Sequence, residues 1–251
     1  MDLLIEQRSG WVRLTLNRPE ARNALNTALL AHIAQTLGSL AHNDSCRAVV
    51  LTGAEGNFAA GADIAEIEHK TTAQAVTDPR KDHWAAIRAF PKPLIAAVEG
   101  YALGGGFELA LMADLIVLGA TAQLGLPETS LGLIPGAGGG QRLLSLAGRM
   151  RATRLVLTGE IIDAATAYEW GIASHVADGP AFPAAAALAD RIAQRAPLAL
   201  AAAKRALVEG AESPLAFATE RAGFEALLDT ADKAEGLAAF RAKRRPGFIG
   251  R

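Results

Sequence analysis

The hydrophobic pattern of the first fifty residues predicts strands around one helix. Two short β-prone runs, Leu3–Gln7 and Val12–Leu16, are separated by a stretch that contains glycine, which is typical of a hairpin. A third apolar run, Ala48–Thr52, ends at a glycine. Between them, apolar residues recur at helical spacing over Thr27–Ala41, and Asn26 is the expected N-cap. We therefore expect an amphipathic helix next to strands.

Helical and fully apolar segments alternate through the middle of the chain. The pattern predicts a helix over Gln74–Ala89, buried strands at Leu94–Val98 and Leu115–Leu118, and a helix over Phe107–Met112 that opens at glycines. Strands that alternate with helices are typical of an α/β fold with parallel strands.

After about residue 140 the pattern becomes almost wholly helical, and only Ile172–Val176 is typical of a strand. Prolines separate the expected helices, which cover Ala184–Arg195, Leu198–Glu209, Leu215–Leu228 and Asp232–Lys243. The chain therefore divides into an α/β core over residues 1–195 and a helical region over residues 196–251.

Composition and charge exclude several classes of protein. With 251 residues and 51% hydrophobic side chains, the chain can bury a large core and is not predominantly disordered. Its formal charge of −1 gives no general attraction to nucleic acid or to an anionic membrane. The lone Cys46 excludes an intrachain disulfide. No signal peptide or membrane span is recognisable, so we expect a cytoplasmic protein.

Common cofactor and metal motifs are missing. The glycines of Gly136–Gly140 resemble a dinucleotide fingerprint, but Gln141 occupies the sixth position and no acidic residue follows a strand at the required distance. Single histidines like those here are more often surface residues than ligands: His32, His42, His69, His83 and His175. We expect neither a metal site nor NAD binding.

Two glycine-containing turns are candidates for binding an oxyanion. Phe58–Ile64 contains small residues between a strand and a helix, although a tight loop alone would explain it. In Gly100–Glu108, three consecutive glycines open a helix and expose backbone N–H groups, which can stabilise negative charge on a carbonyl oxygen. Glu108 would lie in the first turn of that helix, where a carboxylate is also favoured by the helix dipole alone.

A second glutamate, Glu128, lies near another expected helix start, after Pro127 and before the glycines of Leu133–Gly139. Either glutamate by itself could be an ordinary N-terminal acid. Two carboxylates near glycine-lined turns suit general acid/base chemistry on an activated acyl group.

With these motifs the chain resembles the enoyl-CoA hydratase/isomerase (crotonase) superfamily. The matching segments are Leu16–Pro19, Asn23–Leu25, Phe58–Ile64, Gly100–Glu108, Pro127–Glu128, Ile134–Arg142, Leu157–Glu160 and Phe240–Arg245. The resemblance implies an α/β crotonase fold of repeated ββα units in two sheets, with a helical C-terminal trimerisation region and assembly into a trimer or hexamer. It also implies an acyl-CoA thioester as substrate and no cofactor, because coenzyme A is part of the substrate.

The resemblance assigns roles to individual residues. The N–H groups of Ala62 and Gly105 would form the oxyanion hole, Glu108 would be the base that takes a proton from water, and Glu128 would be the acid. The N–H group of Gly136 would anchor the water. Because the chain retains both glutamates, hydration is favoured over the alternatives, an enoyl-CoA isomerase or another crotonase-type lyase.

The family's substrate and CoA contacts fall on residues spread along the chain: Arg22, Ala24, Ala60, Asp63, Ile64, Gly104, Gly136, Phe240 and Lys243. The family often has lysine where this chain has Ala65 and Glu20, so the cations that bind the CoA phosphates stay open. A finer similarity, through Lys92–Val98 and Pro197–Leu200, is to the branch of phenylacetate catabolism that hydrates 2,3-dehydroadipyl-CoA.

Overall fold

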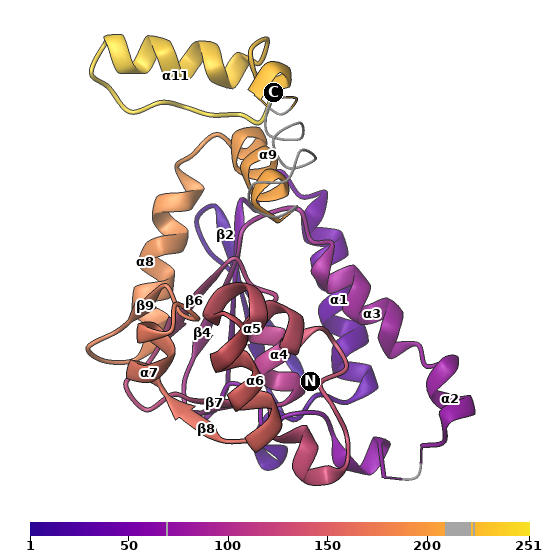
Figure 1. The fold of residues 1–251 in the computed structure, drawn as a ribbon. Coiled ribbons are helices and arrows are strands. Elements are labelled where there is room, and N and C mark those ends of the chain that lie inside the picture. The colour runs from indigo at the N-terminus through magenta and orange to yellow at the C-terminus, as the bar shows by residue number, and fades with distance from the viewer. Residues whose placement is uncertain (69, 209–221, 223) are drawn as a thin grey trace.

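The structure is a computed structural model that describes residues 1–68, 70–208, 222 and 224–251. Its centre is a six-stranded sheet with helices on both faces (Figure 1). In spatial order the strands are β1 (Leu3–Gln7), β2 (Trp11–Leu16), β3 (Ala48–Gly53), β4 (Leu94–Val98), β6 (Leu115–Leu118) and β9 (His175–Val176). The first two strands pair antiparallel, as the predicted hairpin requires, and every later pair is parallel.

A second sheet of three short strands lies beside the first. It consists of β5 (Tyr101–Leu103), β7 (Gln123–Gly125) and β8 (Ile161–Asp163), with β7 in the centre. The chain passes from β4 to β5 through Gly100, where φ is +49° and a Cβ would lie 2.2 Å from the Gly56 carbonyl oxygen. Only glycine fits that turn, so Gly100 fixes the point at which the chain leaves one sheet for the other.

The described helices are α1 (Thr27–Ala41), α2 (Thr72–Val76), α3 (Arg80–Arg88), α4 (Gly105–Ala110), α5 (Gly139–Ala147), α6 (Arg149–Thr158), α7 (Ala164–Glu169), α8 (Ala181–Ala193), α9 (Pro197–Val208) and α11 (Ala231–Arg241). Three 3₁₀ turns accompany them: η1 (Pro19–Ala21), η2 (Ile64–Glu66) and η3 (Pro127–Leu131). The prediction for α1 is confirmed, including its cap, because the Asn26 side chain accepts a hydrogen bond of 2.7 Å from the Leu29 N–H group.

Three sequence predictions in the α/β core are wrong. The single helix expected over Gln74–Ala89 is two helices, α2 and α3, because Pro79 lacks an N–H group and disfavours helical geometry in the residue before it. The strand expected over Ile172–Val176 is limited to β9, since the Ile172 N–H group bonds to Ala167 in the turn after α7. The strand β8 also interrupts a region that was expected to be helical.

The central strands β3, β4 and β6 are buried on both faces and are almost wholly apolar, whereas the edge strand β1 is largely exposed. Along β3, Val49 and Leu51 face the side covered by α1, whereas Val50 faces α8. Three alanines at helical spacing form the buried face of α8: Ala181, Ala185 and Ala189. Their small side chains let α8 pack closely on the sheet, in keeping with a core of few aromatic rings.

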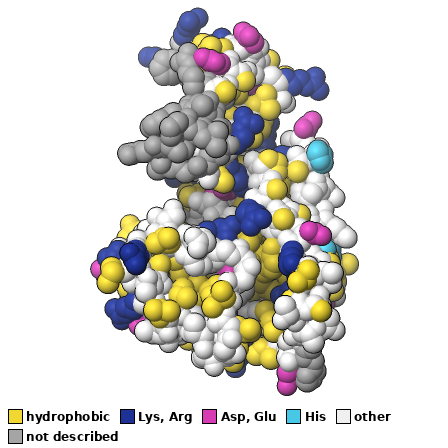
Figure 2. Space-filling model, turned by 45° about the vertical axis from the view of Figure 1, so that its right-hand side comes forward, with side chains coloured by type: hydrophobic (Ala, Val, Ile, Leu, Met, Phe, Trp, Pro, Cys, Tyr) yellow, Lys and Arg dark blue, Asp and Glu magenta, His cyan; other side chains and the backbone are white. Residues whose placement is uncertain are grey.

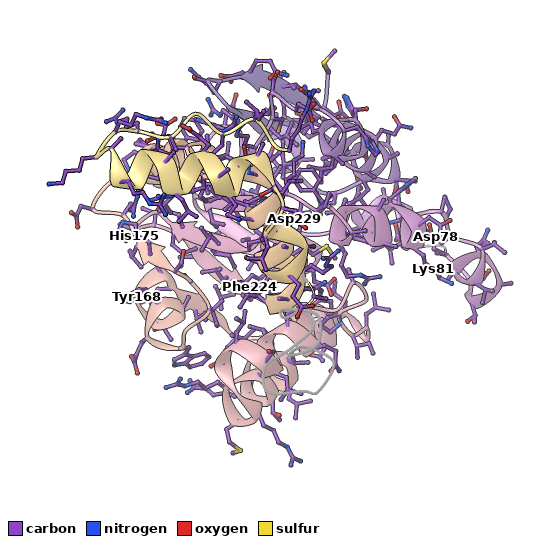
Figure 3. The ribbon with its side chains drawn as sticks, turned by 90° about the horizontal axis from the view of Figure 1, so that it is seen from above. Asp78, Lys81, Tyr168, His175, Phe224 and Asp229 are labelled. Carbon is purple, nitrogen blue, oxygen red and sulfur yellow. The ribbon has the colours of Figure 1, made fainter. Side chains whose placement is uncertain are left out.

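The C-terminal helices α9 and α11 lie over one end of the core (Figure 1). Seen from above, α11 runs from one edge of the molecule toward its centre, and the turn at Asp78 and Lys81 lies at the opposite edge from Tyr168 and His175 (Figure 3). The helix predicted over Leu215–Leu228 falls largely outside the described residues. The boundary at residue 195 and the trimerisation role of residues 196–251 stay predictions. Among the described helices, none is long and apolar enough to cross a membrane.

Candidate active site

The backbone of Ala62 is held so that its N–H group points away from Leu25. Leu25 forms a parallel bridge with Ala62, in which the Leu25 N–H group donates to the Gly61 carbonyl at 2.8 Å and the Asp63 N–H group donates to the Leu25 carbonyl at 3.1 Å. Because Leu25 bonds to the residues on both sides of Ala62, the Ala62 N–H group faces the opposite direction. No described backbone group accepts a hydrogen bond from it.

Gly105 lies on the side to which this N–H group points. A Cβ at Gly105 would be 3.5 Å from the Ala62 nitrogen, so the two backbones are in contact. Gly105 is the first residue of α4, and its own N–H group has no acceptor within the helix. The structure therefore brings together the backbones of Ala62 and Gly105, the two residues to which the family resemblance assigns the oxyanion hole.

The next glycine, Gly106, explains how α4 comes so close. A Cβ at that position would lie 2.1 Å from the Ala59 carbonyl oxygen. Ala59 is itself bridged to β5, since its N–H group donates to the Tyr101 carbonyl at 2.9 Å. The short sheet and Gly106 together fix α4 against the segment that carries Ala62.

Glu108 is buried in α4, with 4% of its surface exposed. Its Oε1 atom accepts two backbone hydrogen bonds of 2.8 Å, from the N–H groups of Ala137 and Gly139. A Cβ at Gly139 would lie 2.8 Å from the Glu108 Cγ atom, so glycine is needed there. Two donors on one oxygen fix the orientation of the Glu108 side chain.

The sequence analysis identified this glycine loop but not the N–H groups in it that donate to Glu108. The family resemblance assigned the Gly136 N–H group to the water, and this role stays a prediction; Gly136 is exposed, and a Cβ at that position would meet only open space. The residues that contact Glu108 are Ala137 and Gly139. The run of glycines before α5 was the available signal, but which N–H groups point at Glu108 depends on the path of the loop.

Glu128, in η3, lies on the other side of the glycine turn. Its Oε1 atom is 3.1 Å from the position of a Cβ at Gly104, and its buried Oε2 atom has no hydrogen-bond partner among the described residues. Burial raises the pKa of the Glu128 carboxyl, a hydrogen bond from its own backbone N–H opposes the shift, and the negative charge of Glu108 adds to it. The two carboxyl groups thus have different environments: Glu108 is held by two backbone donors, whereas the raised pKa of Glu128 favours its protonated form.

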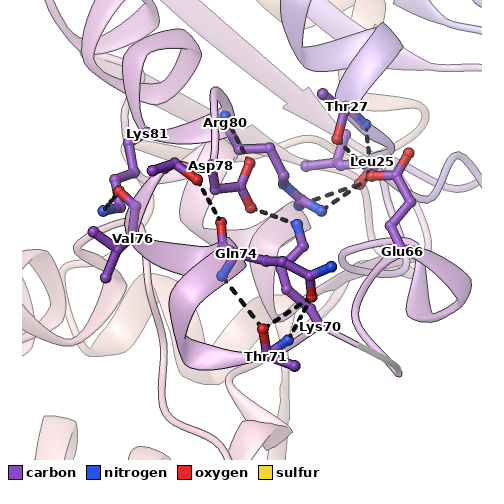
Figure 4. A network of polar contacts seen from close by, with 11 residues as sticks. Leu25, Thr27, Glu66, Lys70, Thr71, Gln74, Val76, Asp78, Arg80 and Lys81 are labelled. Atoms are coloured by element: carbon purple, nitrogen blue, oxygen red, sulfur yellow. Dashed lines mark hydrogen bonds and ion pairs between the residues drawn. The ribbon is translucent and has the colours of Figure 1, made fainter.

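A buried network behind Ala62 was not predicted from the sequence. Arg80 donates to the Leu25 carbonyl at 3.4 Å and to Glu66 at 3.3 Å, and Glu66 also accepts hydrogen bonds from the N–H and hydroxyl groups of Thr27 (Figure 4). Because Leu25 holds Ala62 in place, these contacts tie the segment after Ala62 to the start of α1. No local motif marks Arg80 or Glu66, since their partners are distant in sequence.

Comparison with known proteins identifies the family. A family model described as enoyl-CoA hydratase/isomerase matches residues 6–251. The chain belongs to this family. It is 46% identical over 258 residues to the 2,3-dehydroadipyl-CoA hydratase of Escherichia coli K12, covering 100% of this chain and 99% of that protein. A probable enoyl-CoA hydratase of Mycobacterium leprae is 43% identical and covers 98% of this chain and 96% of its own length.

Solved structures of family members share the fold. An enoyl-CoA hydratase from Bacillus anthracis superposes with a TM-score of 0.93 at 35% identity and covers 100% of both chains. An enoyl-CoA hydratase from Mycobacterium tuberculosis H37Rv gives a TM-score of 0.90 at 37% identity and covers 100% of this chain and 99% of that one. The crotonase fold predicted from the sequence is confirmed.

Several of the predicted CoA contacts of the family lie together beside Ala62. The Ala60 N–H group donates to the Arg22 carbonyl at 3.0 Å, and Arg18 donates to the Ala24 carbonyl at 2.7 Å. Arg18 also forms an ion pair of 3.0 Å with Asp63. The sequence analysis did not single out Arg18, which joins these residues into one surface region next to Ala62.

The remaining predicted contacts are less closely grouped. Ile64 is 62% exposed, as expected of a residue that could cover a ligand, and Gly104 is buried at the start of α4. Lys243 is exposed after α11, and no described contact joins it to the region around Arg22. The side chain of Phe240 lies outside the described part of the structure. No cluster of three metal-ligating side chains occurs in the described ranges.

Proposed function

We propose that this chain is a hydro-lyase that adds water across the C2=C3 bond of a trans-2-enoyl-CoA and forms a 3-hydroxyacyl-CoA. The observation that supports the proposal is that Glu108 lies in the helix that begins at Gly105, that Gly105 contacts the backbone of Ala62, and that Glu128 lies against the adjacent Gly104. The hydratase names of the full-length relatives support it.

The two N–H groups would bind the thioester oxygen. As water adds at C3, negative charge moves onto that oxygen, and donors fixed before the reaction stabilise it without reorganisation. The N-terminal end of α4 points its dipole at the same position. By stabilising this enolate-like charge, the two N–H groups would lower the barrier to attack of water at C3.

The two glutamates would then exchange protons with the reactants on one face of the double bond. Glu108, held by two N–H groups, would take a proton from water as the water oxygen bonds to C3. Glu128, whose pKa is raised, gives its proton to C2. Both added groups come from the same side, so the addition is syn, and proton transfer from Glu108 back to Glu128 restores the starting state.

The substrate brings its own coenzyme A, so the proposed reaction needs no further cofactor. The region around Arg22 and Arg18 supplies cations close to the oxyanion hole, where the CoA moiety would leave the site. Assembly into trimers or hexamers and a cytoplasmic location remain predictions. The name of the Escherichia coli relative adds 2,3-dehydroadipyl-CoA, whose acyl chain ends in a carboxylate, to short acyl chains as a candidate substrate.

The alternative is an enoyl-CoA isomerase, which would move a double bond without adding water. Incubation of the wild-type protein with crotonyl-CoA and, separately, with a 3-enoyl-CoA distinguishes the two activities, because mass spectrometry detects the addition of water and the absorbance of the conjugated thioester detects the migration of a double bond, which leaves the mass unchanged. We expect a gain of one water on crotonyl-CoA. Rapid conversion of the 3-enoyl-CoA to the 2-enoyl-CoA, with no hydrated product from either substrate, would favour the isomerase.

A further inference from the structure

The two backbone N–H groups that hold Glu108 come from a single turn of the chain. Ala137 and Gly139 both donate to the Glu108 Oε1 atom at 2.8 Å, and Gly138 between them has a φ of +95°. Successive N–H groups in a turn that contains a left-handed residue form a concave site for negative charge. The position of the Glu108 carboxyl group therefore depends on the conformation of residues 137–139.

The Arg142 side chain contacts this turn at the peptide group between the two donors. Its Nη1 atom donates to the Ala137 carbonyl at 3.0 Å, and a Cβ at Gly138 would lie 2.7 Å from the same Nη1 atom. The Ala137 carbonyl belongs to the peptide that joins Ala137 to Gly138. Rotation of this peptide would change the directions of the N–H groups on either side of it, so the bond from Arg142 restrains both donors.

The helix that carries Arg142 is itself fixed to the core. Arg142 lies about one turn after Gly139, at the start of α5, and the next residue, Leu143, is buried with 1% of its surface exposed. The Arg142 side chain is half-buried. Within the part of the chain that the structure describes, it forms no ion pair with a carboxylate, and the hydrogen bond of its guanidinium goes to the turn.

We propose that Arg142 is a positioning residue, which holds the turn of residues 137–139 in the conformation that orients Glu108. The inference rests on the proposed function, in which Glu108 takes a proton from water. Arg142 acts through the backbone and does not touch the substrate. A displacement of a reacting group by about 1 Å can lower a rate by about 10²-fold, so the restraint on the turn bears directly on kcat.

Direct binding of the substrate is the alternative role for this arginine. Figure 2 shows a hollow between two lobes of the molecule, with hydrophobic side chains on its walls and basic side chains at its upper end. Loss of a guanidinium that binds the anionic CoA moiety would raise KM, whereas loss of one that orients Glu108 would lower kcat. The two roles therefore predict changes in different kinetic parameters.

The test is the hydration of crotonyl-CoA by Arg142→Met, which keeps an unbranched side chain but removes the donors. We expect kcat to fall by about tenfold to a hundredfold and KM to stay close to the wild-type value. Arg142→Lys, which retains a charged donor, should restore part of kcat. Arg149→Met is the matched control, because Arg149 is an exposed arginine of α6 with no described ion pair, and its kcat should equal that of wild type.

A double-variant comparison separates positioning from a general effect on the fold. In a Glu108→Ala background, Arg142→Met should cause no further loss of rate, because the group that it orients is absent. The proposal would be overturned by an unchanged kcat, by a raised KM at unchanged kcat, by an equal loss with and without Glu108, or by loss of the cooperative thermal melt in Arg142→Met. Absence of hydration by wild type would instead contradict the proposed function.

Discussion

Gly105→Ala separates the chemistry of the oxyanion hole from the stability of the fold. A Cβ at Gly105 would lie 3.5 Å from the Ala62 nitrogen and 3.9 Å from the Ala62 Cβ, which are ordinary contact distances. Gly105 begins α4, where alanine is a better helix former than glycine by up to about 1 kcal/mol. The variant should therefore fold. Its methyl group, however, would occupy space beside the Ala62 N–H group that the thioester oxygen must reach.

The expected loss follows from the loss of one oxyanion donor. Such a loss typically lowers kcat by about 10²–10³-fold, or about 2.7–4 kcal/mol of transition-state stabilisation. Hydration of crotonyl-CoA, followed by the absorbance of the conjugated thioester, measures the rate, and thermal unfolding measures stability. We expect the rate to fall by that factor and the melting temperature to stay within a few degrees of wild type.

Gly106→Ala is the comparison variant, since a Cβ there would lie 2.1 Å from the Ala59 carbonyl oxygen. A clash with rigid backbone forces α4 to move, so this variant should lose both stability and activity. If Gly105→Ala kept near-wild-type activity, or unfolded as readily as Gly106→Ala, the reasoning about the two N–H groups would be wrong.

Two further predictions concern the carboxylates and their support. Because the pKa of Glu128 is raised in the folded state, the protonated side chain stabilises the fold at low pH, and this contribution is lost as the pH rises through that pKa. The melting temperature of Glu128→Gln relative to that of wild type should therefore increase from pH 4 to 8. A difference in melting temperature that does not change with pH would contradict the raised pKa. Arg80→Met should cost about 1.5–3 kcal/mol in urea unfolding, as expected for hydrogen bonds between charged groups. Exposed Lys81→Met is its control, and equal losses would refute the role given to Arg80.

The large elements of the fold were predictable because their signals are local. The capped helix α1 and the buried strands β3, β4 and β6 carry clear periodicity or apolar runs. The strands β5, β7 and β8 are each three residues long, too short to show a pattern. Yet they form the sheet that places α4 against the segment of Ala62.

The residues of the candidate site were partly predictable from the sequence, but their hydrogen-bond partners were not. Glycine runs and acidic residues drew attention to Gly105, Glu108 and Glu128, and family resemblance supplied their expected roles. The donors to Glu108 could not be chosen from sequence, because the choice between neighbouring N–H groups depends on how the loop before α5 bends. Arg80 could not be found either, because it reaches Leu25 across 55 residues of chain.

The central claim is that Glu108 and Glu128 together add water to one face of the double bond. Hydration of crotonyl-CoA in D₂O, with NMR analysis of the 3-hydroxybutyryl-CoA product, tests it directly. We expect wild type to place deuterium at C2 on the same face as the new hydroxyl, and Glu108→Gln and Glu128→Gln each to lower the rate by about 10²–10⁴-fold while remaining folded. Deuterium on the opposite face or on both faces, or near-wild-type rates in either variant, would contradict the account.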